Sequence, residues 1–407
     1  MSFSKKTASL FLIIFSLFFL SSCQAEANST PSTEISLSPT FSVPTEIPTQ
    51  VPAEIPTEAP SPTPQILPTA SNITPYSLPE GINPLTGLPP ASPELLDRRP
   101  IASKIALYPR YVRTTNAGLS SSDIVFEYYI ESGLTRFIAV FYGDNAKRIG
   151  PVRSGRFFDE HIARMYQSYL VFKYADKRVY DHLKSSDIYK FLIVPGNSYC
   201  PPFVIGKQEL DTYNNIFLDA TKFSDCLEKQ EKDNSPPNLY TSYFSDLPPS
   251  AGEPALGIFT QYSLDDYHYW EYQPINQKYY RHQEANGLRD GESHAYAPLF
   301  DALSGEQVTA DNVIFLFVPH TFYDQFQEED EVYHIDLIGL GKAFLFRDGR
   351  VFPIYWRRVA SNQPLLITDL NGMPIPLKPG RTFYQVLGIN SDASNENNLW
   401  YFRFDTP

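Results

Sequence analysis

The side chains best suited to chemistry are gathered in one short stretch, residues 147–156, which reads KRIGPVRSGR. Four of its ten residues are cationic, in a chain whose formal net charge is −13. Gly150 and Pro151 predict a turn there, because proline fixes φ and glycine accepts backbone angles that other residues avoid. A cationic turn of this kind is a candidate site for an anionic ligand.

Two predicted elements position this loop. Residues 135–142 form an apolar run typical of a buried strand, and residues 157–166 have the pattern of a short helix. Free N–H groups at a helix N-terminus and guanidinium groups both suit an anion. The loop residues expected to bind one are Arg148, Arg153, Ser154 and Arg156.

A second set of polar residues precedes the loop. Glu127 and Glu131 lie near the far end of one predicted strand, and Arg136 begins the next. Strand alternation places both glutamates on one face. If Arg136 and the loop arginines reach the same edge, they form an anion cradle beside carboxylates. A salt-bridge network that only fixes the hairpin predicts the same residues, because buried arginines need carboxylate partners, so both interpretations stay open.

Enzymatic chemistry has little support in the sequence. Ser154 has no base at a recognisable spacing, since His161 lies about two helical turns further along. The chain has neither a Gly-x-Ser-x-Gly nor a His-Glu-x-x-His motif. Asp265 and Asp266 lack the spaced ligands of a calcium loop. We therefore predict no catalytic residue, no cofactor and no metal site, and keep an envelope hydrolase or phosphotransferase acting on glycopolymers as an alternative.

The first 23 residues predict export. Lys5 and Lys6 precede an apolar run over residues 10–20, and Ser21-Ser22-Cys23 follows as a small-residue cleavage site. The apolar run is too short to span a membrane comfortably. The terminal cysteine is similar to that of the bacterial lipobox. This resemblance implies cleavage before Cys23 and a lipid on its sulfur, hence anchoring at the extracytoplasmic face of the cell membrane.

The rest of the chain divides by composition. Residues 24–78 are rich in Pro, Thr and Ser and predict a disordered tether, because they bury too little apolar surface to offset ordering. Residues 79–249 mix strand and helix patterns, which predicts a layered mixed α/β domain. Residues 250–407 are nearly all strand-like and predict a small β-rich domain, so the predicted fold class is α+β.

The expected elements follow from periodicity and turn signals. Helices are predicted at residues 157–166, 179–184 and 217–227, and strands at residues 101–107, 124–130, 135–142, 169–174, 267–272, 278–282, 312–318 and 382–388. Residues 341–356 predict a hairpin that turns at Asp348-Gly349.

Cysteines and aromatic residues leave alternatives open. Cys200 and Cys226 can pair in an oxidising compartment, but their spacing does not decide whether they do. Aromatic residues between 267 and 280 can stack on sugars, although filling a β core is the favoured interpretation. The acidic balance argues against a nucleic-acid partner.

Several longer motifs resemble one known family. Residues 83–89 (NPLTGLP), 118–127 (GLSSSDIVFE), 131–141 (ESGLTRFIAVF) and 149–156 (IGPVRSGR) are similar to segments of the YerB-like lipoproteins, whose two halves are domains of unknown function. The resemblance covers nearly everything after residue 80. It implies a mixed α+β fold and a lipid anchor, and no catalytic assignment. Where relatives often carry an Asp-Asn pair, this chain has Ala106 and Leu107.

Together these features predict a tethered extracytoplasmic lipoprotein that acts by binding. Its expected partners are the membrane, through Cys23, and an anionic wall glycopolymer or lipid-linked precursor, through the arginines. A structural partner of a membrane protein complex is the other alternative.

Overall fold

The computed structural model describes residues 77–195, 203–205, 213–240, 242–288, 292–323 and 332–405. The chain separates into two compact units, residues 1–64 and 65–407, and all of the described residues belong to the second unit. The signal segment, Cys23, nearly all of the tether and Cys200 lie outside the described residues. Lipidation and the pairing of Cys200 with Cys226 therefore stay predictions. No helix within the described ranges is long and apolar enough to cross a membrane.

Three α-helices and five 3-10 helices are present in the described part. They are α1 (Asp159–Met165), α2 (Lys177–Ser185), α3 (Phe223–Lys229), η1 (Pro93–Asp97), η2 (Arg110–Thr114), η3 (Leu119–Ser121), η4 (Tyr189–Phe191) and η5 (Ala220–Lys222). The strands before residue 250 are β1 (Ile101–Ile105), β2 (Ile124–Tyr129), β3 (Thr135–Phe141), β4 (Tyr169–Val171), β5 (Leu192–Ile193), β6 (Phe203–Ile205) and β7 (Ile216–Leu218).

The strands after residue 250 are more numerous. They are β8 (Glu253–Pro254), β9 (Gly257–Gln261), β10 (Tyr267–Gln273), β11 (Lys278–Glu284), β12 (Tyr296–Pro298), β13 (Thr309–Ala310), β14 (Asn312–Val318), β15 (His320–Phe322), β16 (Tyr333–Ile335), β17 (Gly339–Arg347), β18 (Arg350–Arg358), β19 (Leu366–Thr368), β20 (Thr382–Gly388), β21 (Asp392–Glu396) and β22 (Leu399–Arg403).

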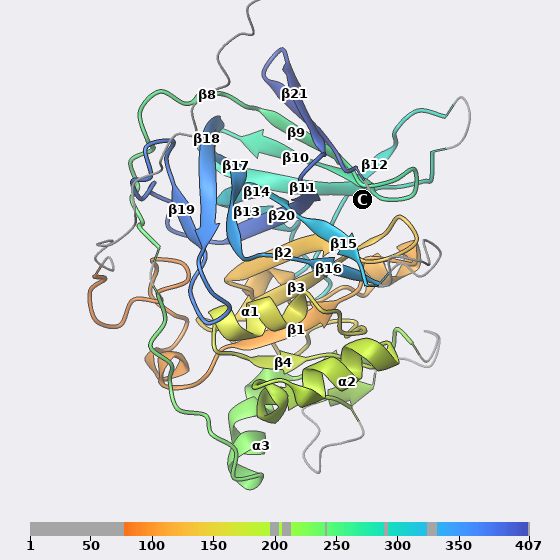
Figure 1. Cartoon of the computed structure of the whole chain (residues 1–407), viewed down its shortest axis with the longest axis vertical. Helices are drawn as coiled ribbons and strands as arrows, with labels where there is room; N and C mark the ends of the chain where they lie inside the picture. The colour runs from red at the N-terminus through yellow and green to blue at the C-terminus, as the bar shows by residue number, and fades with distance from the viewer. Residues whose placement is uncertain are drawn as a thin grey trace, which may run out of the picture. The chain divides into compact units, whose positions relative to one another are not determined.

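One large sheet contains strands from both halves of the chain (Figure 1). Its order is β19-β18-β17-β14-β20-β2-β3-β1-β4-β5, and β8 pairs with β18. Strand β20 joins the halves, because it pairs in parallel with β2 on one side and with β14 on the other. Every residue of β2, β3, β14 and β20 is buried, as expected for strands covered on both faces. The compositional change near residue 250 is therefore not a break in the sheet.

Different elements pack on the two faces of this sheet. A second sheet, in the order β12-β11-β10-β9-β22-β21, packs on one face. There Phe402 of β22 stacks on Phe315 of β14, with ring centroids 3.8 Å apart. On the other face α1 lies against β2, where the rings of Phe158 and Tyr128 have centroids 4.5 Å apart.

Most predicted elements are confirmed. The hairpin β2–β3 forms as expected, and so does β17–β18, whose turn residues Asp348 and Gly349 have φ of 53° and 69°, as a type I′ turn requires. Gly150 has φ of 142°, and a Cβ there would lie 2.7 Å from the backbone nitrogen of Val152. The predicted helix at residues 217–227 is wrong at its start, because Phe217 pairs with Val204 in β7–β6.

The α2 helix depends on a local cap. The Asp176 carboxylate accepts a hydrogen bond from the backbone N–H of Arg178 at 2.8 Å. Asp176→Ala should lower the free energy of unfolding by about 1 kcal/mol, because it leaves that N–H without its acceptor. Urea unfolding midpoints test this, with Asp176→Asn as the matched control that keeps an oxygen acceptor. Equal losses in both variants would show that the cap contributes nothing.

Candidate functional site

The pleat of β1–β3 sorts the polar side chains onto two faces. Tyr128 lies opposite Arg136, and Lys104 lies opposite Ile138. Because paired residues share a face, Lys104, Tyr128 and Arg136 point to the side covered by α1. Glu127 alternates with Tyr128 and points to the second sheet. The predicted binding residues are therefore not all on one face.

Arg136, Arg153 and Arg156, which we call the arginine cluster, lie together on the α1 side. The Arg156 guanidinium is bidentate to the Glu131 carboxylate, with Nε 2.9 Å from Oε2. Arg136 Nη2 is 3.5 Å from Oε1 of the same carboxylate. Arg153 Nη1 donates to Tyr213 O and to Asn214 Oδ1, both at 3.2 Å. The cluster thus joins the start of β3 to the cationic loop.

Among the described residues, two guanidinium groups of the arginine cluster lie close to a single carboxylate. Arg136 and Arg156 share one carboxylate, Glu131. Burial lowers the pKa of Arg136 to about 9, with the charges of Arg156 and Arg153 adding to the decrease. Burial alone would raise the pKa of Glu131, but Arg156 and Arg136 outweigh it, so this pKa is lowered. An incoming anion would relieve the repulsion between the guanidinium groups.

One buried donor of the cluster has no acceptor. Arg136 Nη1 is buried and has no hydrogen-bond partner among the described residues. Leaving such a donor unsatisfied costs free energy. The Glu131 side chain retains 34% of its exposure, so the cluster reaches solvent at this carboxylate. The cluster thus combines a buried donor that has no acceptor in the described part of the chain with a partly exposed carboxylate.

A buried network underlies the arginine cluster. Lys104 Nζ lies 3.1 Å from Asp159 Oδ1, and the Tyr128 hydroxyl donates to the same oxygen at 2.5 Å. The other oxygen, Oδ2, accepts the backbone N–H of Arg156 at 2.7 Å. Burial lowers the pKa of Lys104 to about 7, although Asp159 opposes the decrease. The network connects β1, β2 and α1 to the backbone of the loop. In the sequence, Lys104 within an apolar strand is the one feature that could have indicated it.

The helix N-terminus does not supply the predicted N–H groups. Helix α1 has seven residues, and the N–H groups at its start already have acceptors. Those of Asp159, Glu160 and His161 donate to carbonyl oxygens three residues earlier, and that of Arg156 donates to the Asp159 carboxylate. The prediction that this helix start offers free N–H groups is therefore wrong, whereas anion binding by the loop arginines stays a prediction.

Three predicted residues have other surroundings. The buried Glu127 carboxylate binds Arg281 of β11 at 2.8 and 2.9 Å on the opposite face of the sheet. Arg148 lies over the Phe217 ring, 3.9 Å from its centroid. Ser154 is half-buried between Arg153 and Gly155.

The prediction that strand alternation places Glu131 on the same face as Glu127 is wrong. Strand β2 ends at Tyr129, and Glu131 lies in the turn beyond it.

Glu127, Asp266 and His268 form a group with metal-like geometry, since each offers a ligand atom within 4.8 Å of the others. However, Arg281 already binds both carboxylate oxygens of Glu127. Burial raises the pKa of Asp266 well above its usual value, and the nearby carboxylates of Glu284 and Glu127 add to this. The Arg281 guanidinium group thus already occupies the Glu127 carboxylate, and the group fits a cation poorly.

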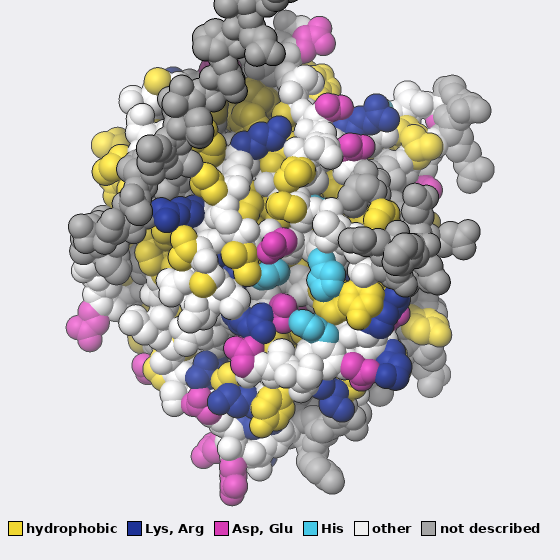
Figure 2. Space-filling view, in the orientation of Figure 1, with side chains coloured by type: hydrophobic (Ala, Val, Ile, Leu, Met, Phe, Trp, Pro, Cys, Tyr) yellow, Lys and Arg dark blue, Asp and Glu magenta, His cyan; other side chains and the backbone are white. Residues whose placement is uncertain are grey.

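Histidines that are scattered in the sequence gather beside α1. His182 Nε2 lies 2.9 Å from Glu160 Oε2, and His161 Nδ1 lies 2.8 Å from Arg358 Nη1. His334 stacks on Phe157 with ring centroids 4.3 Å apart. Figure 2 shows histidine, acidic and basic side chains together on the face over α1, β15 and β16. Sequence spacing gave no signal for this grouping, because the fold brings it together from three separate segments.

Comparison with known proteins gives two family matches and one solved structure. The model of the N-terminal domain of the protein of unknown function DUF3048 matches residues 85–246, and that of its C-terminal domain matches residues 258–384. YerB of Bacillus subtilis (strain 168), whose name designates it a lipoprotein, is 24% identical over 320 residues, 75% of this chain and 85% of that protein. The crystal structure of the Bacillus subtilis YerB protein matches with a TM-score of 0.60 and 21% identity, over 75% of this chain and 96% of that chain. At this identity the match shows a shared fold.

Proposed function

Because the chain belongs to the DUF3048 family and carries both of its domains in order, we propose that it is a membrane-anchored lipoprotein that binds an anionic envelope component. The anchor is the lipid on Cys23, and the binding site is the arginine cluster. The ligand is a wall glycopolymer or a lipid-linked precursor on the extracytoplasmic face.

The proposed location at the membrane rests on the N-terminal residues and on the similarity to YerB. Residues 10–23 have the apolar run and terminal cysteine of a lipoprotein signal, and the related YerB is named a lipoprotein. The proline-rich composition of residues 24–78 predicts a tether between this anchor and the folded part. A ligand within the envelope is therefore within its reach.

The single observation that carries the binding site is the buried Arg136 Nη1 atom, which has no acceptor among the described residues. Arg156 and Arg153 lie beside it, and burial together with their charges lowers the pKa of its guanidinium group. Phosphate oxygens suit such a site, because guanidinium groups bind them through parallel, charge-assisted hydrogen bonds. The Lys104–Asp159 network supports the site by fixing the backbone of Arg156.

Binding of the full chain in detergent to purified wall polymers and lipid-linked precursors tests this function. We expect salt-sensitive binding that Arg136→Gln weakens by roughly tenfold or more, since a hydrogen bond to a charged group contributes about 1.5–3 kcal/mol. Arg156→Gln should act in the same direction and also release Glu131.

Arg350→Gln is the matched control, because Arg350 is an exposed arginine in β18, away from β3 and the cationic loop. Circular dichroism checks that each variant is folded. Undiminished binding by folded Arg136→Gln and Arg156→Gln would contradict the proposal and would favour a structural partnership with a membrane protein. Turnover of the polymer by the parent chain would favour the enzyme alternative.

A further inference from the structure

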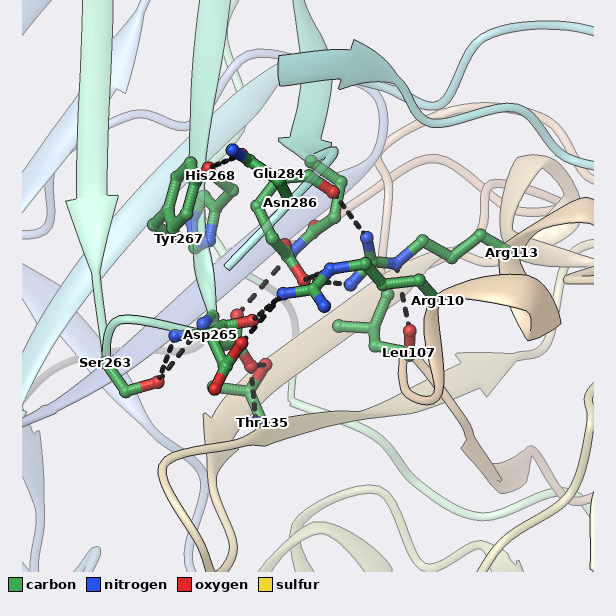
Figure 3. A network of polar contacts seen from close by, with 12 residues as sticks. Leu107, Arg110, Arg113, Thr135, Ser263, Asp265, Tyr267, His268, Glu284 and Asn286 are labelled. Atoms are coloured by element: carbon green, nitrogen blue, oxygen red, sulfur yellow. Dashed lines mark hydrogen bonds and ion pairs between the residues drawn. The ribbon is translucent and has the colours of Figure 1, made fainter. Parts of the chain in front are cut away.

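A separate cavity of about 380 Å³ lies between η2 and the strands β11 and β12. Its lining includes Arg110 and Arg113 from the first half of the chain and Glu284, Leu299 and Phe300 from the second. The volume is within the range of small-molecule sites in proteins. Figure 3 shows the two arginines converging on Glu284 and Asp265.

One wall of the cavity is apolar. Ala297, Pro298, Leu299 and Phe300 follow one another along it. Phe300 is 49% exposed. This wall offers a hydrophobic surface for the uncharged part of a ligand.

The opposite end of the cavity is charged, and two of its charged groups, Arg113 and Glu284, already bind each other. The Glu284 side chain is buried, and its carboxylate is bound by Arg113 Nη2 and by Gln283 Nε2. Arg113 Nη1 donates to Glu284 O at 2.6 Å, and its Nε donates to Leu107 O at 2.9 Å. Arg113 and Glu284 therefore neutralise each other and brace the cavity.

Arg110 is the group with unused capacity. Its Nη2 donates to Asp265 O at 3.2 Å and to Oδ1 at 3.1 Å. Its Nε is buried without a hydrogen-bond partner in the described part of the chain and lies 3.8 Å from Glu284 Oε1. The lining residues contain two guanidinium groups and one carboxylate, and the Arg110 guanidinium group also pairs with Asp265 at 3.1 Å. Asp265 lies outside the lining and is 58% exposed, so water screens its charge.

We propose that this cavity is a second ligand site, and that it binds a small apolar carboxylate. The ligand's carboxylate accepts a hydrogen bond from the Arg110 guanidinium group, whose side chain is 29% exposed, and its apolar part lies on Pro298 and Phe300. The site is independent of the arginine cluster. Because its residues come from both family domains, an occupant would bridge them.

Calorimetric titration of the full chain in detergent tests the site. Hexanoate probes a fatty-acid source of the carboxylate and N-acetyl-leucine probes a peptide C-terminus, while hexanamide and hexylamine have similar shapes without the negative charge. We expect one or both carboxylates to bind at least tenfold more tightly than the amide and the amine. Arg110→Gln should weaken carboxylate binding by at least tenfold, and Phe300→Ala should weaken it less.

Ile275→Ala is the control, because Ile275 is 98% exposed and lies outside the cavity lining. Binding of wall polymers and lipid-linked precursors should be unchanged in Arg110→Gln, so failure at this cavity is distinguishable from failure at the arginine cluster. Equal affinity for hexanamide and hexanoate would overturn the carboxylate assignment. Carboxylate binding that survives Arg110→Gln, or no binding of any probe to the folded parent, would overturn the site.

Discussion

Arg281→Met should lower the free energy of unfolding by about 3–5 kcal/mol, because it leaves the Glu127 carboxylate buried without its cation. Both side chains have no exposed surface. The Arg281 guanidinium group makes two hydrogen bonds to this carboxylate, at 2.8 and 2.9 Å. Burial alone would raise the pKa of Glu127, but Arg281 and His268 outweigh it and lower this pKa to about 2. Urea unfolding monitored by circular dichroism measures the loss.

A double variant separates lost charge pairing from lost packing. Arg281→Met with Glu127→Gln removes the uncompensated charge, so it should regain more than half of the stability that Arg281→Met loses. Arg350→Met is the control for losing a surface arginine. A double variant as unstable as Arg281→Met would contradict the charge explanation. Stability of Arg281→Met equal to that of the parent would contradict the assignment of Glu127 to a structural ion pair.

Acidification should destabilise the parent relative to His268→Leu. Burial, with the nearby Arg281 charge, lowers the pKa of His268 to about 3 in the folded protein, whereas an unfolded chain has a histidine pKa of about 6.5. Between these values the unfolded chain binds a proton that the folded protein does not bind. The histidine therefore costs stability as pH falls from 6.5 toward 3, at about 1.4 kcal/mol per pH unit.

His268→Leu has no imidazole to protonate in the unfolded chain. Its stability relative to the parent should therefore increase by about 3 kcal/mol as pH falls from 6 to 4. The comparison with the parent is essential, because buried acids with a raised pKa stabilise the folded protein as pH falls, which is opposite to the effect of His268. Burial raises the pKa of Asp123 to about 6, and its folded form keeps a proton that an unfolded aspartate loses near pH 4. His294→Leu, at an exposed histidine, is the control. A parallel pH dependence of the parent and His268→Leu would contradict a neutral buried imidazole.

Local sequence determines the elements that could be predicted. The β17–β18 hairpin turns at Asp348 and Gly349 because few other residue pairs accept positive φ at both positions. The β2–β3 hairpin likewise joins two neighbouring apolar runs. In contrast, β20 pairs with both β2 and β14, and nothing in residues 382–388 specifies those partners. Non-local pairing of this kind depends on the whole arrangement of apolar strands.

The same distinction applies to the candidate site. The sequence located Arg136, Arg153 and Arg156, because they flank one hairpin and one glycine-proline turn. It misplaced Glu127, since the partner of that glutamate, Arg281, comes from a strand in the other sheet. It also missed Asp159 as the acceptor of the Arg156 N–H, a contact that depends on how helix α1 packs.

The proposal that the arginine cluster binds an anion is tested most directly by the crystal structure of the protein with tungstate, an anomalous scatterer that mimics phosphate. We expect an anomalous tungsten peak beside the Arg136 guanidinium group and next to Arg153 or Arg156, with a tungstate oxygen within hydrogen-bond distance of Arg136 Nη1, and no such peak in Arg136→Gln. Tungstate bound elsewhere, with the Arg136 guanidinium group unoccupied at a concentration that saturates binding in solution, would contradict it.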